Sequence, residues 1–380
     1  MRFVRALAAL LLVAAALACD RQPPRFAYVA NVDSDDVSAF RVEAGGALTP
    51  LGAAVAVTRR PIALLVAPSG RFLYVVGNGG RPRFEDPGGI TVLSVDPRRG
   101  TPAALATATA QGRLGAAAVT PSGRFLYALQ TTPHRHGVVM SATYGVVTFA
   151  VDPSTGALTA AGPPLESAPG ATLSIDPNGR FLYVASAAWQ APAMLRAFPI
   201  DPQTGALSAP TDVAETGALP ARMLWIPDRA LLYVTDRGGG RSAGSSVRGY
   251  VMDRDSGALA EIGGSPFPTG MGAASNDLAL AADGRLHVAN VDFVSTFLVD
   301  ATSGALAPAV PSRTRVAGRV GAIATRDDRL YVTVLGGAGE AGRVAVFEPQ
   351  GRPREMVQVR GSPFSAGRGP VAIVIVEPAR

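Results

Sequence analysis

The chain has 380 residues, of which 48% are hydrophobic and 17% are charged. Its 43 glycines and 31 prolines make up near a fifth of the chain, below the roughly 25–30% that is typical of low-complexity sequences. Disorder is therefore excluded, and there is enough apolar material for a large core. All 35 basic residues are arginine, against 29 acidic residues. The lack of lysine excludes Schiff-base chemistry, a P-loop lysine and a Ser–Lys dyad.

The net charge of +6 is modest for a chain of this length. No stretch combines clustered arginine with interleaved aromatic residues, so we expect no nucleic-acid partner.

The N-terminal segment has the form of an export signal. Arg2 and Arg5 precede an apolar run over residues 6–18, which ends at the chain's single cysteine, Cys19. Thirteen residues span about 20 Å as a helix, too short for a bilayer core of ~30 Å. The run Ala-Leu-Ala-Cys at its end resembles a bacterial lipobox. We therefore predict a lipoprotein signal peptide over residues 1–18, a lipidated Cys19 and a short tether over residues 19–25.

The alternative is plain cleavage after Ala18 with Cys19 left as a free thiol. With lipidation, the protein would be exported to the cell envelope and held at the membrane by its anchor only. In a Gram-negative cell that is the periplasmic side, and Asp20 favours the inner membrane.

A repeated unit fills the rest of the chain, and its strongest signature is the sequence R-F-L-Y-V with small variations. Its aromatic or histidine position recurs at intervals of 44 to 56 residues, at Tyr28, Tyr74, Tyr127, Tyr183, Tyr233, His287 and Tyr331. Seven units of this size account for the mature chain. Self-similarity of this period indicates a solenoid or a propeller.

Each unit contains the same elements in the same order. An apolar inner strand ends at a P-S-G or P-N-G turn, and the R-F-L-Y-V strand and a variable loop follow. An alternating strand such as residues 146–151 then leads through a D-P-x-T-G turn to a short outer strand. Four strands repeated seven times predict an all-β, seven-bladed β-propeller that forms one domain over residues 26–380. A pair of β-sandwiches is the structural alternative.

The two ends of the chain predict how the ring closes. The first strand, residues 26–30, has the character of a second strand, and the missing inner strand is found at residues 370–376. We expect the C-terminal strand to join the first blade and leave no open edge.

The connections divide the propeller into two faces. The turns from inner to second strand and from third to outer strand are short, and we call their end the turn face. The other connections include the stretches 78–89, 130–144, 236–246, 263–276 and 361–369. They lie at the opposite end, the loop face, where we expect function because variable loops on a rigid scaffold usually carry it.

These repeated strands and turns, with two G-S-P-F segments at residues 264–267 and 361–364, resemble the β-propeller lactonase family. That family includes 6-phosphogluconolactonase-like and carboxymuconate-lactonising propellers. The resemblance implies that enzymatic members carry histidine in H-P-N-G segments, followed by N-E after the next strand. Here Asp176 stands at the histidine position, and Ser186 and Ala187 replace N-E. Hydrolysis of a sugar lactone is therefore an alternative function that would need a site rebuilt from other residues.

His134 and His136 are candidate catalytic residues for that alternative, because they lie two residues apart in a long loop-face connection. No third metal ligand accompanies them, so we expect no metal site and no cofactor. Four other features predict loops or packing instead of sites. They are the G-x-S-x-G run at residues 240–244, the G-x-G-x-x-G run at residues 337–342, the acidic stretch around Asn31, Asp33 and Asp35, and the aromatic Trp189.

A set of arginines at one phase of the repeat gives the main functional prediction. They stand at or near the start of inner strands, where a closed ring would bring them to the channel mouth: Arg60, Arg113, Arg222, Arg319 and Arg368. Guanidinium groups that converge favour a bound anion, such as a sugar acid or a phosphate ester. The alternative is that they extend into solvent or pair with loop acids such as Asp277. We predict a monomer that binds a small anionic molecule, or an envelope protein as a partner or assembly scaffold.

Overall fold

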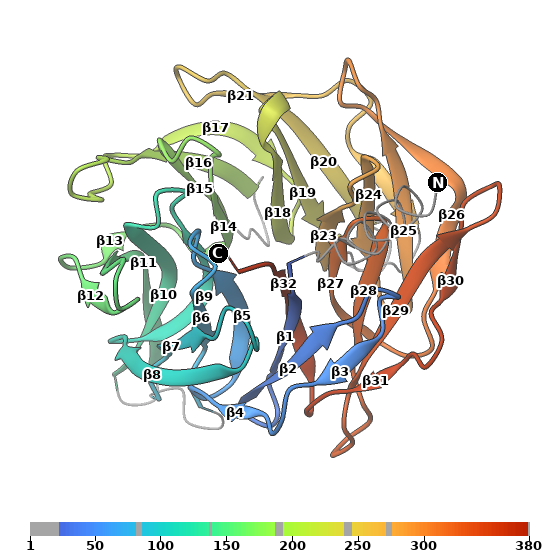
Figure 1. Ribbon diagram of the computed structural model, residues 1–380. Coiled ribbons are helices and arrows are strands. Elements are labelled where there is room, and N and C mark those ends of the chain that lie inside the picture. Colours follow the sequence, from blue (N-terminus) through green and yellow to red (C-terminus); the bar gives the residue numbers. More distant parts are fainter. Residues whose placement is uncertain are drawn as a thin grey trace, which may run out of the picture.

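All strands in the described part of the chain belong to seven antiparallel sheets, arranged as blades around a central axis (Figure 1). The computed structural model describes residues 23–80, 86–136, 139–186, 193–238, 245–270 and 276–378. Helical structure among these residues is limited to one 3₁₀ turn, η1 (Pro227–Arg229), and no described helix is long and apolar enough to cross a membrane. The predicted seven-bladed all-β propeller is confirmed.

The strands of each blade run from the channel outwards. Blade 1 contains β32 (Pro370–Val376), β1 (Arg25–Asn31), β2 (Asp36–Val42), β3 (Leu48–Pro50) and β4 (Val55–Ala56). Blade 2 contains β5 (Pro61–Val66), β6 (Phe72–Gly77), β7 (Gly89–Val95) and β8 (Pro102–Thr109). Blade 3 contains β9 (Arg113–Val119), β10 (Phe125–His136), β11 (Val139–Val151), β12 (Leu158–Ala160) and β13 (Leu165–Glu166).

The remaining blades follow the same order. Blade 4 contains β14 (Gly170–Ile175), β15 (Phe181–Ser186), β16 (Ala193–Pro199) and β17 (Thr211–Thr216). Blade 5 contains β18 (Pro220–Ile226), β19 (Leu231–Asp236), β20 (Ser245–Met252), β21 (Leu259–Glu261) and β22 (Phe267–Gly270). Blade 6 contains β23 (Asp277–Leu280), β24 (Arg285–Ala289), β25 (Phe293–Val299) and β26 (Leu306–Arg315). Blade 7 contains β27 (Val320–Arg326), β28 (Arg329–Val334), β29 (Arg343–Gln350), β30 (Glu355–Gln358) and β31 (Phe364–Ser365).

The ring closes as the ends of the sequence predict. The C-terminal strand β32 pairs antiparallel with β1, from Phe26 opposite Val376 to Asn31 opposite Pro370. Figure 1 shows the two strands, one dark red and one blue, side by side at the channel. A blade built from both ends of the chain leaves no unpaired inner edge, so closure depends on seven residues of β32.

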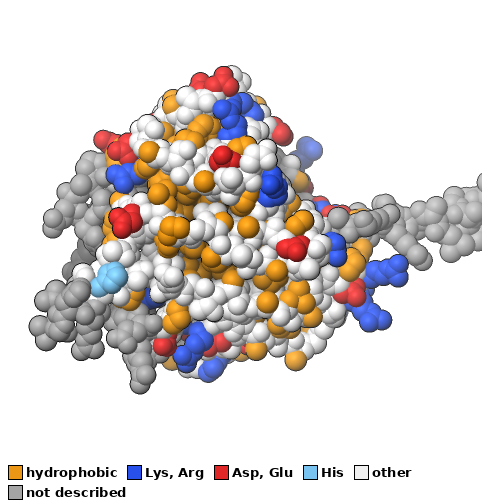
Figure 2. Space-filling model, turned by 90° about the vertical axis from the view of Figure 1, so that its left-hand side faces the viewer, with side chains coloured by type: hydrophobic (Ala, Val, Ile, Leu, Met, Phe, Trp, Pro, Cys, Tyr) orange, Lys and Arg blue, Asp and Glu red, His pale blue; other side chains and the backbone are white. Residues whose placement is uncertain are grey.

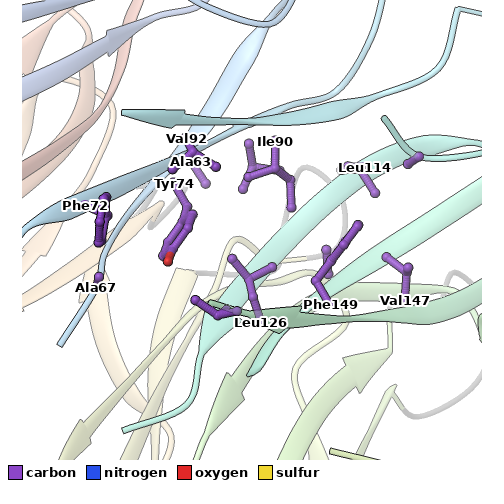
Figure 3. Packing of buried hydrophobic residues seen from close by; sticks show 14 residues of the cluster. Ala63, Ala67, Phe72, Tyr74, Ile90, Val92, Leu114, Leu126, Val147 and Phe149 are labelled. Carbon is purple, nitrogen blue, oxygen red and sulfur yellow. The ribbon is translucent and has the colours of Figure 1, made fainter. Parts of the chain in front are cut away.

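The hydrophobic core lies between blades. Among the described residues, each of seven buried clusters joins two neighbouring blades. Figure 3 shows one of them, where Phe72, Tyr74 and Ile90 of blade 2 face Leu126 and Phe149 of blade 3. Because each blade has apolar side chains on both faces, its central strands are almost wholly apolar and buried, whereas the outer strand β8 is largely exposed.

The R-F-L-Y-V strand and the D-P-x-T-G turn recur together because they form one contact between blades. The tyrosine hydroxyls of Tyr28, Tyr127, Tyr183 and Tyr233 donate to carbonyls in the next blade, on Gly100, Gly205, Gly257 and Gly304, over 2.6–2.8 Å. In the same contact, the arginine before the phenylalanine binds backbone carbonyls of the turn, as Arg124 does with Pro202 and Gln203. The two sequence motifs are therefore the two halves of an inter-blade clasp.

The clasp allows a matched prediction. We expect Tyr127→Phe to lower the free energy of unfolding by about 1–2 kcal/mol, because the buried carbonyl of Gly205 loses its donor. The control is Tyr74→Phe, since the buried Tyr74 hydroxyl has no hydrogen-bond partner among the described residues. Its removal should leave stability unchanged or slightly higher. Equal losses in the two variants, measured by denaturant unfolding, would show that the clasp hydrogen bond does not stabilise the ring.

The strand registers confirm the two faces. Pro61 at the start of β5 lies opposite Gly77 at the end of β6, so the loop after β6 and the entry to β5 share one end of the blade. The prediction of a loop over residues 130–144 was wrong. Strands β10 and β11 stay paired as far as His136 and Val139, because β-branched residues such as Thr131 and Thr143 continue the alternation beyond the blade.

Candidate functional site: the mouth of the channel on the loop face

The predicted arginines all lie at the loop-face ends of inner strands. Arg60 directly precedes β5, and Arg319 directly precedes β27. Arg368 lies two residues before β32, and Arg113 is the first residue of β9. Arg222 lies within β18, and its backbone N–H donates to Thr235 Oγ1 at 3.0 Å. The inner strands of neighbouring blades contact one another around the ring, so these five positions lie around the loop-face end of the central axis (Figure 1).

Arg113 is held by a neighbouring blade-2 residue. Its Nε lies 3.1 Å from Asn78 Oδ1, its Nη2 also contacts that oxygen, and Asn78 Nδ2 donates to the carbonyl of Leu114 at 2.5 Å. Asn78 therefore binds both the backbone and the side chain at the start of β9. This arrangement holds the guanidinium beside the start of the inner strand of blade 3.

Arg222 pairs with an acid, as the alternative reading of the sequence expected. Its Nε lies 3.1 Å from Oδ1 of Asp277 at the start of β23. Asp277 is buried, with only 7% of the residue exposed, and its Oδ2 accepts the N–H of Ile323 on β27 at 3.0 Å. One carboxylate thus joins inner strands of blades 5, 6 and 7.

The other three predicted arginines have no acidic side chain within 4.0 Å among the described residues. The backbone N–H of Arg60 donates to Asp35 Oδ1 at 2.6 Å, but its buried side-chain Nε has no partner in the described residues. Arg368 lines a cavity of about 250 Å³ beside Asp33 and Glu340. The side chains of Arg319 and Arg368 are exposed.

Arg237 adds a further cation that the sequence analysis missed. It directly follows β19, and desolvation together with the nearby charge of Arg319 lowers its pKa from the usual value for arginine. The guanidinium stays charged, because arginine does not lose its proton in proteins. Arg237 occupies the same repeat phase as Asn78, four residues after the repeated tyrosine. Comparison of that phase across the units would have found it.

His134 lies on the paired extension of β10 and not in a loop. Its Nε2 is 3.1 Å from Thr143 Oγ1, and the side chain lines a cavity of about 270 Å³ with Gln130, Tyr144 and Glu166. The side chain of His136 lies outside the described residues, as do Trp189 and residues 240–244. Within the described ranges, no three His, Cys, Asp or Glu side chains come together as metal ligands.

Asp176, at the position where the family resemblance implies histidine, stabilises a turn on the turn face. Its buried carboxylate accepts the backbone N–H groups of Asn178, Arg180 and Phe181 at 2.6–2.9 Å. Ser186 Oγ accepts the N–H of Met194 at 2.9 Å on the neighbouring strand. Both groups are used in local structure.

Other motifs also have structural roles. The glycines of residues 337–342 lie in the connection from β28 to β29, and no helix follows them. Asn31 donates through Nδ2 to Asp36 and Ser38 within the β1–β2 hairpin. His287 is buried at the clasp position of blade 6, with Nδ1 3.0 Å from Thr296 Oγ1, and burial lowers its pKa to about 4. Of these groups, Gly337 and Gly339 line the cavity beside Arg368.

The chain is a closed seven-bladed propeller with arginines at the loop-face ends of its inner strands. The family model described as lactonase, 7-bladed beta-propeller matches residues 79–216. The match covers about a third of the chain and agrees with the resemblance to the β-propeller lactonases, and the seven-bladed fold is the one that this resemblance implies. No curated protein matches it in sequence.

Solved structures of similar shape cover nearly the whole chain. The periplasmic gluconolactonase of Pseudomonas aeruginosa has a TM-score of 0.72 at 19% identity, covering 94% of this chain and 100% of its own. A candidate 6-phosphogluconolactonase from Bacteroides fragilis has a TM-score of 0.69 at 19% identity, covering 93% and 98%. A hypothetical selenium-binding protein from Sulfolobus tokodaii reaches 0.66 at 11% identity, covering 94% and 96%. At these identities the likeness concerns the fold alone.

Proposed function

We propose that this propeller binds a small anionic ligand at the loop-face mouth of its channel, through Arg60, Arg319 and Arg368. The observation that carries the proposal is that these three arginines at equivalent inner-strand positions lack acidic partners among the described residues. Arg113 and Arg222, at related positions, are held by Asn78 and Asp277. The mouth therefore has two arginines that are held by neighbouring side chains and three that have no acidic partner among the described residues and can bind a ligand.

An anion is the chemistry that fits such a mouth. Like charges repel one another, and the repulsion falls when a negative group lies between them. The planar guanidinium matches the oxygens of a carboxylate or a phosphate and can donate two parallel hydrogen bonds to them. A sugar acid or a sugar phosphate supplies such a group on a compact molecule.

The test is thermal unfolding of the purified protein with 6-phosphogluconate, gluconate or neutral glucose, at low and high salt. A ligand that binds only the folded state raises the melting temperature, and we expect a rise of about 2 °C or more at saturation with 6-phosphogluconate. Glucose should give no rise. High salt should weaken the effect, because it screens the exposed arginines.

The matched variants remove three positive charges from either face. Arg60→Ala, Arg319→Ala, Arg368→Ala should abolish the response to anions. Arg98→Ala, Arg99→Ala, Arg352→Ala removes three exposed arginines from the turn face and should keep the response. If both triple variants respond like the wild type, the arginines at the mouth do not bind the anion.

A sugar-lactone hydrolase is the second candidate, favoured by the cavity around His134. Structures named as gluconolactonases share the fold, and the cavity places an imidazole near the carboxylate side chain of Glu166. His134 would act there as a general base for water. Lactone turnover that is lost in His134→Ala and kept in His287→Gln would replace the binding proposal with catalysis. Absence of turnover over a panel of sugar and aliphatic lactones would reject the hydrolase.

We further propose that lipidated Cys19 anchors the protein to the cell envelope with its loop face away from the membrane. Strand β1 begins at Arg25 on the turn face, because Arg25 lies opposite Val42, just before the turn to β3. Six residues from Cys19 to Pro24 reach about 20 Å at most. Cys19→Ala should move the protein from the membrane fraction to the soluble fraction. If the wild-type protein is found in the soluble fraction instead, it is secreted without a lipid anchor.

A further inference from the structure

The cations on the loop face continue outwards from the channel mouth over blades 6 and 7. Arg319 precedes β27, and its carbonyl accepts the N–H of Leu335 at 2.8 Å. Across the same blade, Val320 lies opposite Val334, and Val334 lies opposite Arg343 at the start of β29. Two strand spacings of ~4.8 Å put Arg343 about 10 Å outwards from the mouth.

Blade 6 contributes two more arginines beside this row. Arg315 ends β26 on the loop face, opposite Phe293, and only three residues separate it from Arg319. The guanidinium of Arg313 stacks 4.8 Å from the centre of the Phe293 ring, which holds it at this end of the blade. All four side chains are exposed: Arg313, Arg315, Arg319 and Arg343.

The charge of this group is not neutralised by the described residues. None of the four arginines has an acidic oxygen within 4.0 Å, although Asp292 and Glu340 lie on connections of the same two blades. Glu340 is directed into its own loop, where its Oε2 accepts the N–H of Gly337 at 3.2 Å. By contrast, on the outer side of the propeller that Figure 2 shows, acidic and basic side chains are interspersed around a band of hydrophobic ones.

We propose that the anion of the mouth is one unit of a linear, carboxylate-bearing polysaccharide that extends over Arg343 and Arg315. This inference rests on the proposed function and names its ligand class. A single small anion can neutralise the mouth but cannot reach cations about 10 Å further out, whereas a chain with repeated carboxylates can bind them together. In the described part of this surface no aromatic side chain is fully exposed, and the partly buried ring of Phe293 is already stacked on Arg313. This favours a polysaccharide over single-stranded nucleic acid, whose bases need stacking partners.

The experiment compares one unit with many. Binding of galacturonate and of an oligogalacturonate of about ten units is measured by calorimetry on the whole protein at low salt. We expect the oligomer to bind at least tenfold more tightly per molecule than the monomer. In Arg315→Ser, Arg343→Ser this advantage should fall about tenfold while monomer binding stays unchanged, because only the outer contacts are lost. The control Arg98→Ser, Arg99→Ser removes two turn-face charges and should bind as wild type.

The outcomes separate the two proposals. If the monomer binds and the oligomer has no advantage, the polysaccharide inference is overturned and the anion site at the mouth stands. If neither binds, the proposed function fails as well. An oligomer advantage that persists in Arg315→Ser, Arg343→Ser would exclude the outer arginines. Tighter binding of oligothymidylate than of oligogalacturonate would assign the surface to nucleic acid and reject the polysaccharide.

Discussion

Gly205→Ala should lower the free energy of unfolding by about 3–4 kcal/mol, because the new methyl group would enter the inter-blade clasp. Gly205 has a φ of 72°, a left-handed conformation that is strained for alanine, at about 1 kcal/mol. A Cβ built there lies 2.4 Å from the ring of Phe125 in the previous blade, and overpacking costs roughly 1–3 kcal/mol more. Loss of the hydrogen bond from Tyr127 would add to this effect.

The control is Gly162→Ala, which keeps the backbone strain and removes the clash. Gly162 has a φ of 94° in an exposed connection, and a Cβ there meets nothing within 4 Å. We expect it to lose only about 1 kcal/mol in urea or guanidinium unfolding. If both variants lose the same amount, the contact between Phe125 and the turn does not limit stability, and the D-P-x-T-G glycines are needed for their conformation alone.

The repeat made the fold predictable, because its motifs form the same contact between successive blades. The glycine of D-P-x-T-G needs a positive φ and also faces the phenylalanine of the preceding blade, so the sequence keeps both residues in phase. Ring closure was equally readable, since β32 has the apolar run of an inner strand but no partner nearby in the sequence.

The extended hairpin of blade 3 and the pairings at the mouth were harder to predict, for different reasons. The proline and two histidines in residues 130–136 are typical of a loop, yet strands β10 and β11 stay paired through them. Whether an arginine at a given phase is paired depends on side chains from other blades. Asp277, which binds Arg222, is 55 residues away in the sequence. The position of an arginine within the repeat predicts where it lies on the ring, but not which side chain of another blade pairs with it.

The titration of His287 should affect stability between pH 6.5 and pH 4. Burial lowers its pKa from 6.5 to about 4, while neighbouring Asp283 and Arg285 act in opposite directions. In the unfolded chain the imidazole takes up its proton near pH 6.5, and in the folded protein only near pH 4. Between these values the unfolded state binds more protons, so the free energy of unfolding falls as pH falls. The full contribution is present above pH 6.5.

The expected loss across that window is about 3 kcal/mol in the wild type, and it should be absent in His287→Gln, which cannot titrate. Denaturant unfolding at half-unit steps from pH 7.5 to 4 measures both slopes. The turn carboxylates act in a lower window: for example, hydrogen bonds from Ser154 lower the pKa of Asp152 below 3.8, so its contribution is lost only as pH falls below that value. A wild-type slope that survives unchanged in His287→Gln would mean that the pKa of His287 is the same in the folded and the unfolded protein. In that case the burial of the imidazole beside Thr296 would not disfavour its protonated form.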